Sequence, residues 1–223
     1  NIARGLDGSI LDSDIKNPTL CIPHGVISEA FNENDIIYKK IIAEGVFNGE
    51  SKYFAIQSKI MNKSLNTHKL KGKPLITGNL IFSNKIKDTK PREKYILYAT
   101  TLKQFSNLQF LGVDMFYEYW ETLKDLEILS KQVEEKIFVK IHPHYKYCTK
   151  LLGKHFKNLT FSNDKIDILL KNSLALITLS SGTIEDALNS KVPVILYDYK
   201  NRYKQMKCFE INGEDKSVYY INK

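Results

Sequence analysis

Short apolar runs alternate with amphipathic segments along the chain from about residue 94 onwards. The runs have the length and composition of β-strands, and the segments between them carry apolar residues at the three- and four-residue spacing of helices. We predict strands at residues 94–101, 136–144, 159–162, 174–180 and 192–198, and helices at residues 116–135, 147–156, 164–173 and 182–191. This alternation is typical of a parallel sheet covered by helices, so we expect an α/β, doubly wound and Rossmann-like unit.

The N-terminal part of the chain shows the same pattern in a less regular form. Its strand-like runs end in polar or glycine-containing sequence, and a helical segment stands between the last two, which resembles the tail of another α/β unit. These strands are predicted at residues 19–27, 52–58 and 73–79, and the helix at residues 59–70.

An apolar-poor stretch at residues 82–94, broken by Pro91, has the composition of a linker. We therefore predict a partial N-terminal domain at residues 1–82 and a C-terminal domain at residues 83–223. Because the chain opens on Asn1 in sequence that reads as the middle of a domain, we expect a further N-terminal portion of the protein to precede it.

The composition favours a folded, cytoplasmic protein. The chain has 223 residues, 43% of them hydrophobic, which is enough for a core. Its longest apolar runs, such as residues 174–179, are far shorter than the roughly 20 residues of a membrane-spanning helix. The three cysteines show no CxxC spacing, so neither a disulfide framework nor a thiolate metal site is expected.

The net charge of +8 is spread along the chain without a polybasic block. It fits a solvated lysine-rich surface, a phosphate-bearing ligand, or peripheral contact with the inner membrane surface. Sequence patterns of duplex-binding proteins are absent, so we expect no nucleic-acid partner.

Polar side chains follow the predicted strands, at the edge of the sheet where open α/β sheets bind ligands. They are hydrogen-bond donors and turn formers instead of the acidic clusters that hold divalent metals, so no metal site is predicted. These strand ends are His24-Gly25, Thr77-Gly78-Asn79, Thr100-Thr101, His142-Pro143-His144 and Ser180-Ser181-Gly182-Thr183.

The turn from Ser180 to Thr183 lies between a buried strand and a helix, so serine hydroxyls and unpaired backbone N–H groups are expected to form an anion seat. The missing Cβ of Gly182 would let a phosphate approach. The alternative is a helix cap, because Thr183 to Asp186 matches the capping-box pattern. Glu185 in the first helical turn suits hydrogen bonds from a ribose.

A histidine at the end of a strand, fixed by a proline as His142 is by Pro143, can donate to a phosphate or exchange protons near neutral pH. The alternative is a turn histidine bonded to backbone. Lys140 adds positive charge nearby, and His24 in the N-terminal unit is the corresponding candidate there.

Three common catalytic patterns are missing from the sequence. It has no GxSxG nucleophile elbow, no P-loop lysine motif and no GxGxxG fingerprint. Readings as a serine hydrolase, a P-loop kinase or a dehydrogenase are therefore excluded.

Three segments in this order, "ILYATTLK", "VKIHPH" and "LSSGTIEDALNSKVPVILYD", resemble the donor-binding half of GT-B glycosyltransferases. The likeness is to bacterial surface-polysaccharide enzymes with cytidine-activated donors: the CDP-glycerol glycerophosphotransferases, the capsule Kdo transferases and the polysialyltransferases. Their "YAPT", "HP" and "SS" motifs correspond to Tyr98–Thr101, His142-Pro143 and Ser180-Ser181, with Thr100 in place of the proline. "CIPHGVI" and "PLITGN" look like the acceptor-half motifs, with Leu80 replacing a proline.

This resemblance implies transfer of a glycosyl or polyol-phosphate group from a cytidine-linked donor to a glycan or lipid-linked acceptor, without metal or other cofactor. His142 and Ser180-Ser181 would hold the donor phosphates and Glu185 the ribose. The acceptor base would come from the first domain, where His24 is the candidate. The remaining donor-site candidates are Thr100, Thr101, Pro143, Gly182 and Thr183.

Two other functions stay open. A non-hydrolysing UDP-sugar 2-epimerase shares the fold and a serine-glycine turn followed by glutamate, which "SSGTIEDA" also fits. A catalytically inactive nucleotide-sugar-binding subunit is the third reading.

Overall fold

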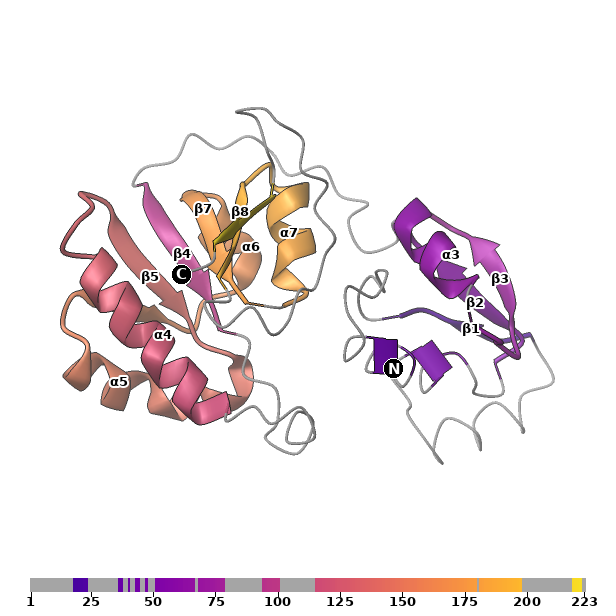
Figure 1. Ribbon diagram of the computed structural model, residues 1–223, viewed down its shortest axis with the longest axis horizontal. Helices are drawn as coiled ribbons and strands as arrows, with labels where there is room; N and C mark the ends of the chain where they lie inside the picture. Colours follow the sequence, from indigo (N-terminus) through magenta and orange to yellow (C-terminus); the bar gives the residue numbers. More distant parts are fainter. Residues whose placement is uncertain are drawn as a thin grey trace. The chain divides into compact units, whose positions relative to one another are not determined.

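The computed structural model describes residues 18–23, 36–37, 40, 43–44, 47, 51–66, 68–78, 94–100, 115–179, 181–197 and 218–221. The chain divides into two compact units (Figure 1). The N-terminal unit comprises Asn1–Lys85 with Lys204–Lys207, and the C-terminal unit comprises Ile86–Tyr203 with Cys208–Lys223. The predicted linker at residues 82–94 falls mostly outside the described residues, so the boundary between residues 82 and 83 stays a prediction.

The N-terminal unit contains a three-stranded parallel sheet in the order β1-β2-β3. Its elements are β1 (Leu20–Cys21), β2 (Tyr53–Ile56), α3 (Lys59–Leu65) and β3 (Lys73–Ile76). Helix α3 begins where Ser58 accepts a hydrogen bond from the Met61 N–H at 3.1 Å, which satisfies a free donor of the first turn. Phe54, Ile56, Met61 and Leu65 pack into the core beneath this helix.

The C-terminal unit contains six parallel strands in the order β6-β5-β4-β7-β8-β9. The chain therefore starts in the middle with β4, moves outward through β5 and β6, and returns beside β4 with β7 before moving outward again. This is the Rossmann strand order, and it places a topological switch point between β4 and β7. The strands are β4 (Tyr95–Ala99), β5 (Lys136–Lys140), β6 (Leu159–Ser162), β7 (Ser173–Thr178), β8 (Val194–Tyr197) and β9 (Val218–Ile221).

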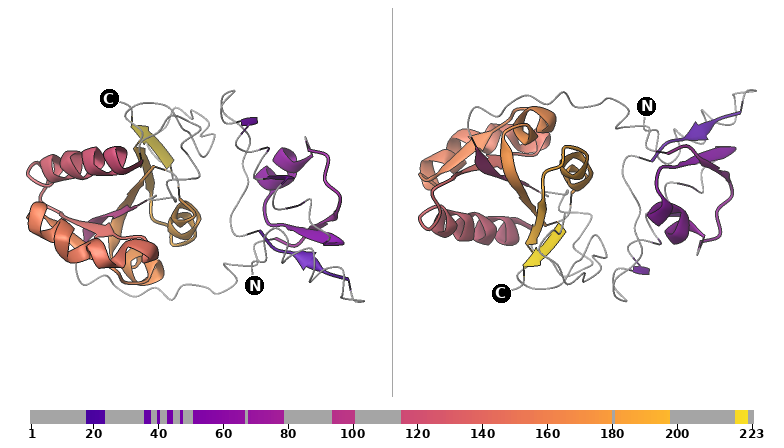
Figure 2. Two further views of the ribbon diagram at one scale, coloured as in Figure 1. Left: turned by 90° about the horizontal axis from the view of Figure 1, so that it is seen from below. Right: turned by 90° about the horizontal axis from the view of Figure 1, so that it is seen from above.

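The helices that connect these strands cover both faces of the sheet. They are α4 (Met115–Leu129), the 3₁₀ helix η3 (Pro143–Cys148), α5 (Thr149–His155), α6 (Ile166–Leu170) and α7 (Thr183–Asn189). Helices α4 and α5 lie together on one side of the strands, and α7 lies on the other (Figure 2).

Strand alternation decides which side chains enter each layer. On β5, Ile137 and Val139 are fully buried against α4 and α5, as is Ile141 directly after the strand. On β4, the side chain of Tyr95 points to the opposite face, where its hydroxyl donates to the Leu169 carbonyl of α6 at 2.7 Å. Each face of the sheet is therefore packed, as a doubly wound sheet requires.

Helix α4 ends at Leu129, whereas the sequence predicts a helix over residues 116–135. The Ser130 hydroxyl donates to the Glu127 carbonyl at 2.8 Å, and this is the carbonyl that the Lys131 N–H would use if the helix continued. Lys131 donates to Ile128 instead, which tightens the chain into a turn.

Strand β5 also ends earlier than predicted, at Lys140, although the Ile141 N–H still donates to the Ser162 carbonyl of β6. Pro143 has no N–H to continue the ladder, and the 3₁₀ helix η3 begins there. The sequence does not predict strand β9, which is a four-residue strand (Val218–Ile221) at the edge of the sheet beside β8.

The packing of α4 predicts a large difference between two of its apolar side chains. Leu123→Ala removes a fully buried side chain and should lower the free energy of unfolding by about 2–5 kcal/mol. Ile128→Ala, where the side chain is exposed, should change it by no more than about 0.5 kcal/mol. The single tryptophan, Trp120, lies in α4, so urea denaturation followed by its fluorescence reports on this unit. Equal losses in both variants would contradict this packing.

Candidate functional site

The candidate site is the carboxyl edge of the six-stranded sheet, on either side of its switch point. Thr100 follows β4, His142 follows β5, and Ser181 follows β7. Because β4 pairs in parallel with both β5 and β7, all three residues lie at the same edge. Neighbouring strands are about 4.8 Å apart, so the ends of β5 and β7 are separated by roughly 10 Å.

Thr100 fastens the end of β5 to the end of β4. Its N–H donates to the Lys140 carbonyl at 3.2 Å, and its Oγ1 accepts from the His142 N–H at 2.9 Å. The side chain is buried. Thr100 therefore positions the backbone of His142. The phosphate contact that the sequence predicts for Thr100 stays a prediction.

His142 is half-buried at the point where the chain leaves the sheet. Its carbonyl accepts from the Tyr145 N–H at 2.8 Å, which closes the first turn of η3 after Pro143. The imidazole lies 6.3 Å from the Tyr145 ring, measured between ring centres. Strand alternation places Phe138 and Lys140 on the face opposite the core under α4 and α5, and His142 follows two residues after Lys140.

Thr178, which the sequence reading did not single out, performs a similar task on the other side of β4. It is fully buried, and its Oγ1 donates to the Ala99 carbonyl at 3.0 Å. This bond joins the ends of β7 and β4 directly before the serine turn. The sequence does contain a sign of this role, because Thr178 places a hydroxyl within the apolar run at residues 174–179. A polar group that is buried in such a run needs a hydrogen-bond partner.

The turn before α7 differs from both predicted forms. Helix α7 begins at Thr183 with Gly182 as its N-cap, and no side chain caps it. A capping-box threonine must lie outside the helix, whereas Thr183 is its first residue. Among the residues that the structure describes, the buried Oγ1 of Thr183 has no hydrogen-bond partner. The capping-box interpretation is therefore wrong.

The expectation that backbone N–H groups at this turn are unpaired is also corrected. The Thr183 N–H donates to the Ser181 Oγ at 3.3 Å, and the N–H groups of Ile184 and Glu185 donate to the carbonyls of Ser181 and Gly182. A tight first turn satisfies these donors internally. The hydroxyl of half-buried Ser181 can still donate to an anion, because only its oxygen accepts within the turn.

Two other predicted residues lie close to this turn. Gly182 has φ −58° and open space where a Cβ would stand, so its backbone does not require glycine, and the room beside it fits an approaching ligand. Glu185 is half-buried in the first turn of α7. Its contact with a ribose stays a prediction.

His24, Thr101 and Ser180 lie outside the described residues, as does the side chain of His144. The predicted convergence of the His142 imidazole and the Ser180-Ser181 hydroxyls on one phosphate group therefore stays a prediction. In the described ranges, no three histidine, cysteine or acidic side chains are grouped closely enough to hold a metal ion.

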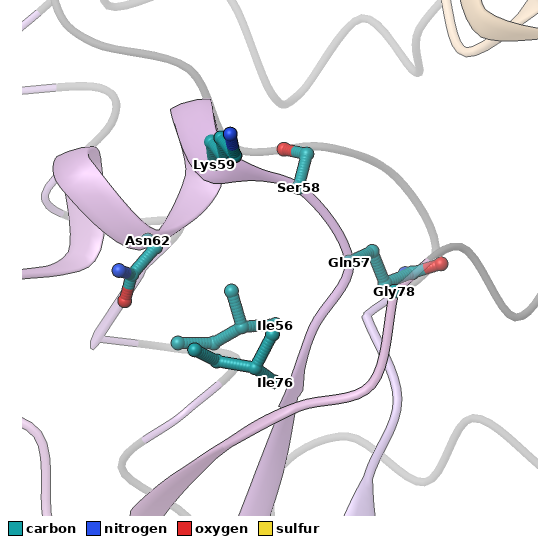
Figure 3. A pocket seen from close by; sticks show the side chains of 7 residues that line it. All are labelled: Ile56, Gln57, Ser58, Lys59, Asn62, Ile76 and Gly78. Carbon is teal, nitrogen blue, oxygen red and sulfur yellow. The ribbon is translucent and has the colours of Figure 1, made fainter.

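The N-terminal unit has a cavity of about 210 Å³ beside α3 (Figure 3). Its apolar floor is formed by Ile56 and Ile76, which are register partners on β2 and β3. Ser58, Lys59 and Asn62 of the first turns of α3 supply polar groups around it. Gln57 and Gly78 complete the lining. This cavity also lies at the carboxyl end of a parallel sheet.

No family model matches the chain, and no curated protein matches it by sequence. Solved structures do match. The UDP-GlcNAc 2-epimerase of Methanocaldococcus jannaschii with UDP-GlcNAc and UDP superimposes with a TM-score of 0.55 at 18% identity, over 86% of this chain and 56% of that protein. MnaA of S. aureus with UDP gives 0.54 at 14% identity, over 85% and 53%. A proposed UDP-N-acetylglucosamine 2-epimerase of Listeria monocytogenes gives 0.52 at 16% identity, over 77% and 48%.

These likenesses confirm the predicted fold class, which is α/β with Rossmann-like parallel sheets of the GT-B type. The chain spans about half the length of the proteins that it matches. Across the part of the chain that the structure describes, none of the helices combines the length and apolar character needed to cross a membrane.

The contact between Thr100 and His142 predicts a specific loss of stability. Thr100→Val keeps the shape of the side chain but removes the acceptor of the His142 N–H, so the free energy of unfolding should fall by about 1–3 kcal/mol. Thr100→Ser keeps the oxygen and should lose less than half as much. Urea denaturation followed by Trp120 fluorescence measures both variants. Identical stabilities for valine and serine would show that the hydrogen bond does not hold the strand ends together.

Proposed function

We propose that this chain binds a nucleotide-activated donor at the carboxyl edge of its six-stranded sheet. The observation that carries this proposal is that His142 and Ser181 follow the two strands that flank β4, at the switch point of a Rossmann-like sheet. Open α/β sheets bind ligands at this position. The nucleotides bound by the similar solved structures, UDP and UDP-GlcNAc, support the same class of ligand.

In this proposal, His142 donates a hydrogen bond to a phosphate oxygen of the donor and stabilises the charge that develops as the nucleotide leaves. Ser181, with Ser180 beside it in the sequence, donates from its hydroxyl to the same phosphates. Glu185 accepts from the ribose. Thr100 and Thr178 hold the strand ends in place through the hydrogen bonds described above.

The reaction that we propose first is transfer of a glycosyl or polyol-phosphate group in bacterial surface-polysaccharide synthesis, from a cytidine-linked donor and without a metal ion. The ordered "HP" and "SS" motifs at His142-Pro143 and Ser180-Ser181 support it. The acceptor, a glycan or lipid-linked glycan, is assigned to the N-terminal unit, where the cavity beside α3 offers an apolar floor and polar groups. His24 is the proposed acceptor base, and the protein is proposed to work in the cytoplasm, at the membrane surface if its acceptor is lipid-linked.

The second candidate is epimerisation of a UDP-linked sugar. The fold likeness to a UDP-GlcNAc 2-epimerase at a TM-score of 0.55 favours it, and the sequence of the turn before α7 fits either reaction. A subunit that binds nucleotide sugars without catalysis is the third possibility.

Nucleotide titration separates these functions. We expect a cytidine nucleotide (CMP or CDP) to bind more tightly than UDP in calorimetric titration of the chain, because the proposed donor is cytidine-linked. Preference for UDP would support the epimerase instead, and binding followed by no turnover with any donor would support the non-catalytic subunit. If none of the three nucleotides releases heat or shifts the melting temperature, the proposed function is wrong.

Ser181→Ala tests the phosphate-binding role of the hydroxyl. Losing a hydrogen bond to a charged group costs about 1–3 kcal/mol, so nucleotide affinity should fall roughly fivefold to 150-fold. Ser190→Ala is the matched control, since Ser190 ends the same helix and its hydroxyl donates to the Asp186 carbonyl at 2.8 Å. The same affinity in both variants would leave Ser181 as a turn residue only.

A further inference from the structure

Lys140 occupies a distinctive place at the end of β5. It is the last residue of that strand, in register with Ala99 of β4 on one side and Ser162 of β6 on the other. Because Val139 and Ile141 are buried under α4 and α5, alternation places Lys140 on the opposite face. Ala99 shares that face and carries only a methyl group, so β4 does not cover the lysine side chain.

The ammonium group reaches toward the carboxyl edge of the sheet. Lys140 Nζ donates to the Ile141 carbonyl at 3.0 Å, and that oxygen belongs to the residue beyond the end of the strand. An ammonium group has three donors, and this contact uses one of them. The charge of Lys140 therefore lies next to the backbone of His142.

Burial and a neighbouring carboxylate shift the pKa of Lys140 in opposite directions, and the net shift is downward. Partial burial lowers the pKa of the ammonium group, and the carboxylate of Asp164 raises it. Asp164 follows β6 and is held by Ser162, whose hydroxyl donates to it at 2.9 Å and accepts from its N–H at 3.0 Å. A cation kept partly away from water, with one exposed carboxylate near it, gains from a second anion at the same edge.

We infer that Lys140 is a further donor-binding residue, whose ammonium group contacts a phosphate oxygen of the nucleotide beside His142. The inference rests on the proposed function. It deepens that function because it gives the β5 side of the site two donors, one cationic, while Ser181 supplies the donor across β4. Lysine binds phosphate as a point charge, whereas arginine uses a planar fork of donors. A point charge suits this position at the end of a strand.

Two methionine substitutions on the same strand test the inference. Lys140→Met should weaken binding of the nucleotide that the unaltered chain prefers among CMP, CDP and UDP by roughly tenfold to a hundredfold. Lys136→Met is the control, because Lys136 lies on the same face of β5 at its opposite end. It should leave the affinity within about twofold. Calorimetric titration measures affinity, and melting temperatures show whether both variants stay folded.

Asp164→Asn gives a second test that does not depend on how Lys140→Met folds. Removing the carboxylate takes away a negative charge that would repel the phosphate near Lys140, so affinity should rise severalfold. A fall in affinity, or equal affinities for the two methionine variants, would overturn the role of Lys140. The failure of the proposed function has a different signature: the unaltered chain itself would bind no nucleotide.

Discussion

The structure of the C-terminal unit depends on the parallel pairing of β4 with β5 on one side and with β7 on the other. The chain adds strands outward on one side of β4 and then outward on the other side. The connections that follow β4 and β7 therefore lead away from each other at the centre of the sheet. Two threonine hydroxyls join the ends of these three strands at the carboxyl edge of the sheet. Thr100 accepts from the backbone of the β5 end, and Thr178 donates to the last carbonyl of β4.

From this pairing follows the sorting of side chains between the two faces. The α4 and α5 side of β5 takes the aliphatic residues of the core, whereas the other side carries Lys140 at the edge, directly before the end of the strand leads to His142. A cationic residue at a strand end is costly to bury, and Lys140 avoids most of that cost by reaching the Ile141 carbonyl and the open edge. The positive charge of the candidate site is therefore a consequence of register as well as of composition.

The strands and most helices of this unit were predictable, because apolar runs in a buried parallel sheet are short, continuous and separated by helical periodicity. Features set by single hydrogen bonds were not. The end of α4 depends on the Ser130 hydroxyl taking one carbonyl, and the start of α7 falls on Thr183, one residue earlier than a capping box at Thr183 would need. In the site, the strand ends could be identified from the sequence, but the positioning roles of Thr100 and Thr178 required the register between strands.

The edge described here binds phosphate groups in our proposal, and this explains why transfer and epimerisation are hard to separate from the fold. Both reactions begin with an activated sugar whose negative charge lies on its phosphates, so both favour donors such as His142, Ser181 and Lys140 at the switch point. The base and the surface that recognises the second substrate distinguish the reactions. In an open α/β sheet those groups come from loops, which vary independently of the strands that hold the phosphates. Base preference, which is a property of the nucleotide and not of its phosphates, is therefore the more discriminating observation.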